Sequence, residues 1–192
     1  MLKGAVRAYQ KTVGGLYPFK CPFYPSCSNY CRECLDRYGS VRGIMMTSDR
    51  LLRCHIRASS TKAYDIISEN GAARLLDPPE RNCIWTQHGE ANPKSPAVGG
   101  LLSLFIPGAG QWYGGRKIDA VFAFSTVATF AAGTLVAKHN GEEGWAWTVG
   151  AVGGVFYLGN VYGGINAAHR YNEKYGDGDR PVVNVTFLGF SW

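Results

Sequence analysis

The fold of this chain depends on two stretches, Cys21-Pro22-Phe23-Tyr24-Pro25-Ser26-Cys27-Ser28-Asn29-Tyr30 and Arg50-Leu51-Leu52-Arg53-Cys54-His55. The first stretch holds two prolines, three aromatic residues and two cysteines in ten positions. Because proline fixes φ and removes a backbone donor, this composition predicts a stiff loop that orients its cysteines and aromatic rings. The second stretch ends with the pair Cys54-His55, at the end of an expected helix.

Charge is divided unevenly along the 192 residues, a length that allows one or two domains. Residues 1–96 carry 14 Lys/Arg and 8 Asp/Glu, whereas residues 97–192 carry 6 of each. A basic half followed by a neutral, glycine-rich, apolar half predicts a peripheral cytoplasmic module joined to a membrane-embedded one. Nucleic-acid binding by the basic half is the weaker interpretation, because its arginines are spread along helices rather than clustered.

Helical periodicity organises the first half. Apolar residues recur at helical spacing over residues 2–17, while Lys3, Arg7 and Lys11 fall on another face. A basic amphipathic helix of this kind can lie in the headgroup plane of a membrane, so these three residues are candidates for a membrane-surface contact. A soluble helix that packs its apolar stripe on a core is the alternative.

Two more helices are expected before residue 55. Ser26 or Ser28 is a candidate N-cap for a helix that runs to about Tyr38 and ends at Gly39 as its C′ residue. The next helix runs from about residue 40 to 54. The expected fold class is therefore all-α.

The second half contains two long apolar runs, 118–137 and 145–165, which a short polar connector joins. About 20 apolar residues are needed to cross the ~30 Å hydrocarbon core, so the runs predict a transmembrane helical hairpin. Two buried core helices are the alternative. Arg116 and Lys117 precede the first run, and Arg170 and Lys174 follow the second. By the positive-inside rule both termini are expected in the cytoplasm, and the glycines at 150, 154 and 159 offer a face for close helix packing.

The expected domain organisation has four parts. A helical domain over 1–76 is followed by a proline-rich linker over 77–96, a membrane domain over 97–175 and a tail over 176–192. Residues 107–110 interrupt the apolar sequence before the first run. Residues 181–192 alternate weakly, as a short strand does.

Six cysteines in a basic segment without an apolar leader favour reduced thiols over a disulfide framework. Cys27, Cys31 and Cys34 have the spacing of a radical S-adenosylmethionine cluster, but the barrel and nucleotide motif of that class have no counterpart here. At i, i+4 and i+7 of a helix they share one face, and we favour packing over a metal site. Zinc would need four ligands, for which Cys21, Cys27, Cys31, Cys34, Cys54 and His55 are the candidates.

No arrangement of nucleophile and base, paired carboxylates or phosphate-binding loop stands out in the sequence. The expectation is a protein without catalytic residues, cofactor or metal. A metal- or thiol-dependent membrane enzyme that uses the Cys/His cluster is the alternative.

Residues 5–65 resemble the YidD family of membrane protein insertion efficiency factors. The similarity runs through Tyr9-Gln10-Lys11 and the motif Cys21-x-Phe23-Tyr24-Pro25-Ser26-Cys27-Ser28-x-Tyr30. It continues through Gly39 and Gly43 to Arg50-Leu51-Leu52-Arg53-Cys54-His55 and ends at Tyr64-Asp65. The motif residues expected to matter are Cys21, Phe23, Tyr24, Pro25, Ser26, Cys27, Ser28, Tyr30, Arg50, Arg53, Cys54 and His55.

This resemblance implies a small protein on the cytoplasmic side of the inner membrane that binds membrane lipid. It implies that the protein assists nascent membrane proteins beside the YidC insertase and the Sec translocon. Two departures from the family pattern are visible: Ile56 stands where a proline is expected, and Ala63-Tyr64-Asp65-Ile66 replaces a Gly-Tyr-Asp-Pro ending.

Residues 100–165 are similar to TM2-like two-helix membrane modules. The similarity rests on Pro107-Gly108-x-Gly110-Gln111-x-Tyr113-x-Gly115 ahead of the apolar hairpin. This module is expected to anchor the first domain to the membrane.

Overall fold

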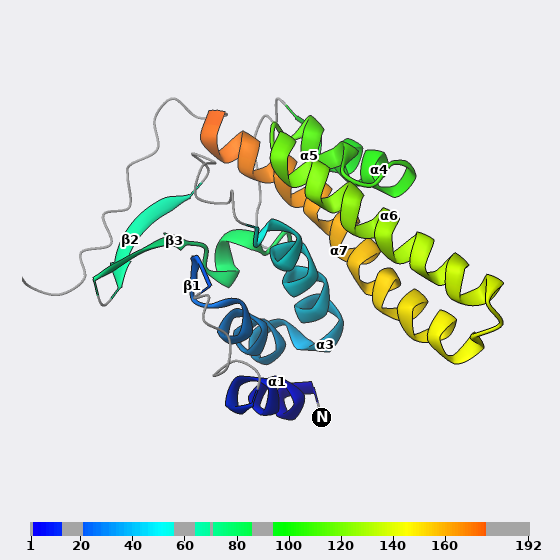
Figure 1. The fold of residues 1–192 in the computed structure, drawn as a ribbon. Helices are drawn as coiled ribbons and strands as arrows, with labels where there is room; N and C mark the ends of the chain where they lie inside the picture. The colour runs from blue at the N-terminus through cyan, green and yellow to red at the C-terminus, as the bar shows by residue number, and fades with distance from the viewer. Residues whose placement is uncertain (1, 13–20, 56–63, 70, 86–93, 176–192) are drawn as a thin grey trace, which may run out of the picture.

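The computed structural model describes residues 2–12, 21–55, 64–69, 71–85 and 94–175. Helices dominate, and a small sheet lies at one side of them (Figure 1). In chain order the elements are α1 (Leu2–Lys11), β1 (Phe23–Tyr24), α3 (Cys27–Arg53), β2 (Asp65–Glu69), β3 (Ala72–Leu76), the 3₁₀ helix η2 (Pro79–Asn82), α4 (Pro96–Phe105), α5 (Ala109–Tyr113), α6 (Lys117–His139) and α7 (Glu143–Tyr175).

Helix α3 is two helices joined by a sharp bend. Gly39 has φ 78° and ψ 178° inside it, a conformation that residues with a Cβ rarely adopt. The expected break at Gly39 is thus confirmed. Of the two candidate caps, Ser26 is the N-cap, because its side chain accepts a hydrogen bond from the backbone N–H of Asn29.

The expected helical fold is confirmed in part: helices make up most of the structure, but a three-stranded sheet in the order β1-β3-β2 is also present, so the fold is not all-α. β2 and β3 are antiparallel, and β1 pairs with β3 in parallel, with Phe23 opposite Leu75. Gly71, with φ 77°, lies in the turn between β2 and β3. The strand β1 lies within the proline-rich loop and forms only by pairing with residues about 50 positions later. No local periodicity signals such a strand.

Part of the stretch expected to be a linker is packed inside the molecule. Asp77, Pro79 and Asn82 are buried, and η2 spans the last two of them. Cys83 belongs to a buried cluster with Tyr30 and Tyr162. The prolines at 78 and 79 start a tight 3₁₀ turn here instead of a solvated connection. Residues 86–93 of that stretch lie outside the described residues.

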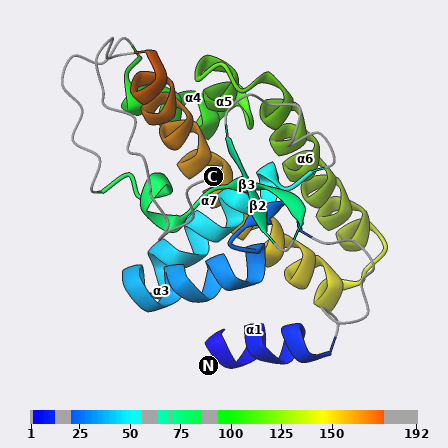
Figure 2. The ribbon, with the colours of Figure 1, turned by 90° about the vertical axis from the view of Figure 1, so that its left-hand side faces the viewer.

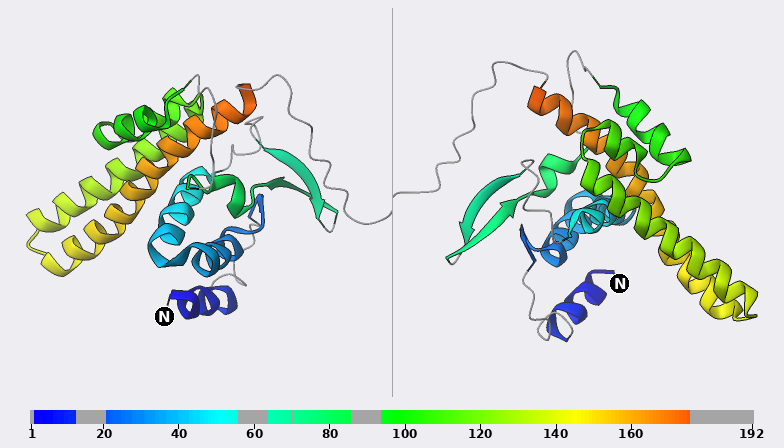
Figure 3. Two further views of the ribbon diagram at one scale, coloured as in Figure 1. Left: turned by 180° about the vertical axis from the view of Figure 1, so that it is seen from behind. Right: turned by 45° about the horizontal axis from the view of Figure 1, so that its top comes forward.

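Helices α6 and α7 form an antiparallel pair, and the end of this pair that carries their connector extends beyond the rest of the molecule (Figure 3). The break at 107–110 is confirmed, since α4 ends at Phe105 and α5 begins at Ala109. Within the described part of the chain, α6 is the one helix that is long and apolar enough to cross a membrane.

The second predicted span does not meet the same criterion. Its later part, in α7, carries Asn160 and Tyr162, and Asn166 follows directly after it; none of these three residues has exposed surface. These polar side chains bond to η2, α5 and the segment between α4 and α5. The end of α7 therefore packs inside the protein, and only its first part has the apolar exposure expected of a span.

Helix α1 lies against α3, apart from the sheet and from the α6–α7 pair (Figure 2). Gln10 holds it there by donating hydrogen bonds to Ser28 and Asn29, each at 2.9 Å. Arg7 and Lys11 are exposed, as the surface prediction requires. The side chain of Lys3, the helix expected over 13–17 and the strand expected over 181–192 lie outside what the structure describes.

The α3–α7 crossing depends on one of the glycines singled out in the sequence. A Cβ built on Gly159 would lie 2.3 Å from Cβ of Ser48, whereas one on Gly154 meets nothing within 4 Å. Of these two, only Gly159 permits a close helix approach.

We expect Gly159→Ala to lower the free energy of unfolding by about 1–3 kcal/mol, because the added methyl group forces α3 and α7 apart. Gly154→Ala is the matched control on the same helix. It should be neutral or stabilising by up to about 1 kcal/mol, through helix propensity. Unfolding of the detergent-solubilised protein, followed by tryptophan fluorescence, measures both. Equal effects of the two substitutions would contradict the close approach.

Candidate functional site

The two motif stretches meet in space. Arg50, fully buried on α3, donates from Nη2 to the carbonyl oxygen of Pro25 at 2.6 Å. Its guanidinium lies over the rings of Phe23 and Tyr30, at 4.8 and 4.2 Å from their centroids. This one side chain therefore fastens the proline-rich loop to the second half of α3 by a hydrogen bond and two cation–π contacts.

Three of the motif cysteines form a cluster of thiols. The Sγ atom of Cys21 lies 3.4 Å from that of Cys27 and 3.9 Å from that of Cys54, and all three lie within 4.8 Å of one another. All three are free, half-buried thiols. Hydrogen bonds from Cys27 and Cys54 to its thiolate lower the pKa of Cys21. The cluster is the group among the described residues that could hold a metal.

The other two cysteines of the sequence pattern lie elsewhere. Cys34 is buried beside Tyr30, Met46 and Cys83, and burial raises its pKa to about 12. The packing interpretation therefore fits Cys34, and Cys31 is absent from the thiol cluster. For Cys27 the interpretation is incomplete, because the start of α3 faces Cys21 and Cys54 as well.

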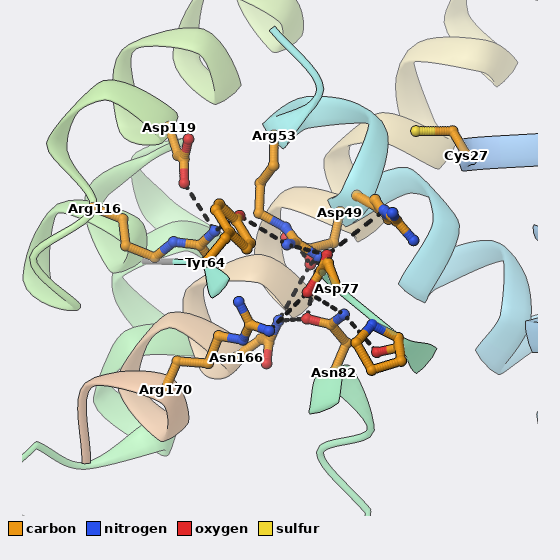
Figure 4. A network of polar contacts seen from close by, with 12 residues as sticks. Cys27, Asp49, Arg53, Tyr64, Asp77, Asn82, Arg116, Asp119, Asn166 and Arg170 are labelled. Carbon is orange, nitrogen blue, oxygen red and sulfur yellow. Dashed lines mark hydrogen bonds and ion pairs between the residues drawn. The ribbon is translucent and has the colours of Figure 1, made fainter. Parts of the chain in front are cut away.

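The second motif arginine, Arg53, is the centre of a buried polar network (Figure 4). Its Nη1 donates to Asp77 at 2.8 Å and to the hydroxyl of Tyr64 at 3.0 Å. Its Nη2 lies 2.9 Å from the carboxylate of Asp49 and 3.2 Å from the side-chain oxygen of Asn82. All of its nitrogens have partners, as a charge with 1% exposure requires.

Asp77 is the anion on which this network converges. Its Oδ2 pairs with Arg53, and its Oδ1 accepts from Arg170 at 2.7 Å and from Asn82 at 3.0 Å. Burial alone would raise the pKa of Asp77, but the guanidinium groups of Arg53, Arg170 and Arg50 hold it well below its usual value. The carboxylate is therefore charged at every physiological pH.

The motif residue His55 reaches a different element, α6. Its Nε2 lies 2.8 Å from the carboxylate of Asp119, and its ring stacks on Phe122 at 4.0 Å between centroids. Arg116 then joins Asp119, at 2.9 Å, to the hydroxyl of Tyr64, at 2.5 Å. His55, Tyr64 and Arg53 thus connect the N-terminal motifs to the start of α6.

Helix α7 completes the network from the opposite side. Asn166 donates to Asn82 at 3.0 Å and to Asp49 at 3.3 Å, and Arg170 reaches Asp77. Figure 4 shows these side chains converging from α3, η2, α6 and α7, with Cys27 outside the network. The network is a polar junction between the N-terminal motifs and the C-terminal helices.

A cavity of about 360 Å³ opens beside this junction. Its lining includes Tyr64, Arg116 and Arg170 and charged residues of both signs, among them Arg81 and Glu173. A lining of this kind suits a polar or charged group better than an apolar chain.

The structure brings some residues of the sequence-based site list together and leaves others apart. The structure brings Cys21, Cys27 and Cys54 together, places Arg50 and Arg53 in the core, and leaves Tyr24 exposed. Ser26 caps α3, and Ser28 accepts from Gln10. The sequence held one signal for some of the residues that it did not identify. Asp119, Asn160 and Asn166 are polar residues within apolar helices, where such residues are uncommon. The residues that sequence reasoning missed are Asp49, Asp77, Asn82, Arg116, Asp119, Asn166 and Arg170.

Asp77→Asn should lower the free energy of unfolding at pH 7 by about 3–5 kcal/mol, because it leaves buried arginines without their counter-charge. The folded pKa of Asp77 is depressed, so its stabilisation is present above about pH 4 and is lost as the pH falls towards the folded value. The variant should therefore show a flatter stability profile between about pH 5 and 2.

Asp65→Asn is the matched control, because this carboxylate forms an exposed pair with Arg81. It should cost less than about 1 kcal/mol. Chemical unfolding at several pH values measures both variants. A steep acid profile that survives in Asp77→Asn would contradict the assignment.

Comparison with known proteins identifies the N-terminal part. The family described as "Putative membrane protein insertion efficiency factor", YidD, matches residues 1–67. A protein of that description from Nitrosomonas eutropha is 44% identical over 55 residues, which are 29% of this chain and 80% of the relative. One from Geobacter sulfurreducens is 47% identical over 58 residues, 29% of this chain and 84% of the relative.

A relative from Bacillus licheniformis is 46% identical over 50 residues, which are 26% of this chain and 62% of the relative. No solved structure matches the chain. The matched residues contain the proline-rich loop, the thiol cluster, Arg50, Arg53 and His55. The similarity of residues 100–165 to TM2-like modules stays a prediction. Through its first 67 residues, this chain belongs to the YidD family of membrane protein insertion efficiency factors.

Proposed function

We propose that this chain is a non-enzymatic accessory factor that assists insertion and folding of integral membrane proteins at the bacterial inner membrane, beside the YidC insertase and the Sec translocon. One observation carries the proposal: residues of the family domain are bonded directly to the helices that follow it in the chain. Arg53 reaches η2, His55 reaches α6 and Asp49 reaches α7. The family domain and its membrane attachment then act as one unit.

The outer surface of the C-terminal helices supports a lipid environment. Only 11% of the most apolar window of α6 is buried. Large apolar side chains are exposed on three helices, and contiguous exposed apolar surface marks a contact with a membrane or a protein. They include Leu101, Leu104 and Phe105 on α4, Val121, Phe124, Leu135 and Val136 on α6, and Trp145, Trp147, Val152 and Leu158 on α7.

We propose that α6 crosses the membrane and that the first part of α7 returns beside it, as in a TM2-like module. The connector between them is only three residues long, from 140 to 142, so α7 must run back along α6. Arg116 and Lys117 at the start of α6 and Arg170 and Lys174 near the end of α7 favour a cytoplasmic location for that end. Both termini would then be cytoplasmic.

Helix α1 supplies a second contact with the membrane surface. Arg7 and Lys11 are exposed on it, and Tyr9 and the loop residue Tyr24 present exposed rings. Cations attract anionic headgroups, and amphipathic rings such as tyrosine favour the membrane interface. These surfaces are the proposed contacts with lipid and with nascent membrane proteins; nucleic acid is not a proposed partner.

A metal- or thiol-dependent membrane enzyme is the second candidate, and the thiol cluster is the observation that favours it. The two candidates differ in what Cys27→Ser changes. An enzyme loses turnover on a substrate while it keeps its partners. If the protein is an insertion factor, the variant keeps its contacts with nascent chains as long as it is folded. It loses those contacts when it unfolds.

A photo-crosslinking residue at Tyr9 or Tyr24 should capture a nascent membrane protein or the insertase during synthesis of a membrane protein on stalled ribosomes. Ribosomes stalled on a soluble protein are the control and should give no product. Mass spectrometry of the crosslinked bands identifies the partners. Absence of both nascent chain and insertase from both positions would contradict the proposed function.

Asn140→Cys tests the topology. A membrane-impermeant maleimide added to intact spheroplasts should label this variant above the background of the native thiols, because residue 140 lies in the connector between α6 and α7. Val41→Cys, exposed on α3, is the control and should be labelled only after lysis. Failure to label residue 140 until lysis would contradict a crossing by α6.

A further inference from the structure

The thiol cluster has the build of a metal site, and the proposed function does not use it. Its sulfurs come from three places: the loop before β1, the first residue of α3 and the C-cap of α3. Cys21 and Cys54 pack against the buried Phe23, Tyr64 and Leu75. The bend at Gly39 turns the second half of α3 back, so its two ends lie close enough for their cysteines to meet.

The sulfur separations fit one metal ion between them. Zinc–sulfur bonds of about 2.3 Å in a tetrahedron place two sulfurs about 3.8 Å apart. The separations from Cys21 to Cys27 and Cys54 are 3.4 and 3.9 Å, and the remaining pair is within 4.8 Å. A disulfide would need about 2.05 Å. The three sulfurs therefore stand at the spacing of separate ligands of one ion.

The charge beside the cluster also fits. Zn²⁺ with three thiolates has a net charge of −1, and each bound thiol releases its proton to solvent, so no oxidant is needed. The buried guanidinium of Arg50 lies against the proline-rich loop between Cys21 and Cys27, where it donates to the carbonyl oxygen of Pro25. Its Nε and Nη1 have no hydrogen-bond partner among the described residues, and its ion pair with Asp77 is 3.6 Å long. Arg50 thus has positive charge available to balance the cluster.

We propose that Cys21, Cys27 and Cys54 bind one Zn²⁺ ion, with the fourth position left to a ligand from outside these three residues. The ion would join the two motif stretches of the family domain. Cys21 and Cys27 belong to the first stretch, and Cys54 belongs to the second. This site does not depend on the insertion role, because it concerns the fold of residues 21–54 alone.

The test begins with full-length protein, stripped of metal and kept anaerobic and reduced. Zinc titration against a chromophoric chelator should give one ion per chain. X-ray absorption of the zinc protein should show three sulfur ligands and one lighter ligand. Cobalt(II) in place of zinc should give the visible bands of a tetrahedral thiolate site. Fewer than three sulfurs around zinc in the wild-type protein overturns the proposal.

Substitutions locate the site. Cys21→Ser, Cys27→Ser and Cys54→Ser should each weaken zinc binding at least tenfold, and Cys31→Ser, a half-buried cysteine on the same helix, should leave it unchanged. Arg50→Met should weaken it about 10–100-fold, as loss of a supporting group around a metal does. Equal loss in Cys31→Ser, or no zinc bound by the wild-type protein, overturns the proposal.

Two controls keep these outcomes distinct. Circular dichroism reports whether each variant is folded. If a variant is unfolded, the number of sulfur ligands around zinc in the wild-type protein, measured by X-ray absorption, decides whether the zinc site exists. Peptide mapping of the anaerobic protein identifies a disulfide between two of the three cysteines, a result that also overturns the proposal. Failure of the zinc site leaves the crosslinking test of the insertion function unaffected.

Discussion

The ion pair between Arg53 and Asp77 is the interaction on which the rest of the structure depends. Both groups are almost fully buried, 2.8 Å apart, and neither charge is stable there without its partner. Asp77 also accepts from Arg170, and Arg53 also donates to Tyr64 and Asn82. One pair therefore ties α3, η2 and α7 together. A network in which every member depends on its neighbours holds these elements in one arrangement.

Bonds of this network cross the boundary between the family domain and the rest of the chain. The family match ends at residue 67, yet Asp77 and Asn82 beyond it pair with the family's Arg53. His55 extends the same connection to Asp119 at the start of α6. The exposed apolar surface of α6 and α7 lies beyond this polar junction, so the junction bonds the motif domain directly to the two helices that carry that surface.

Local signals were enough to predict several elements. Gly39 marked the bend of α3, Ser26 was one of two candidates for its cap, and the long apolar run predicted α6. The second apolar run was misjudged at its end, because neighbouring parts of the protein bond the polar side chains of Asn160 and Tyr162 there. The sheet was missed because β1 exists only through its pairing with β3.

By itself, the sequence determined the family of the first third, the order of the helices and the position of the bends, because these follow from motifs and short-range backbone preferences. Only the tertiary structure decided that Arg53 meets Asp77, that Asn166 meets Asp49 across 117 positions, and that three of six cysteines share one cluster. Charge pairs and sulfur ligands act over a few ångströms, and no spacing along the chain reveals which distant residues folding will bring that close.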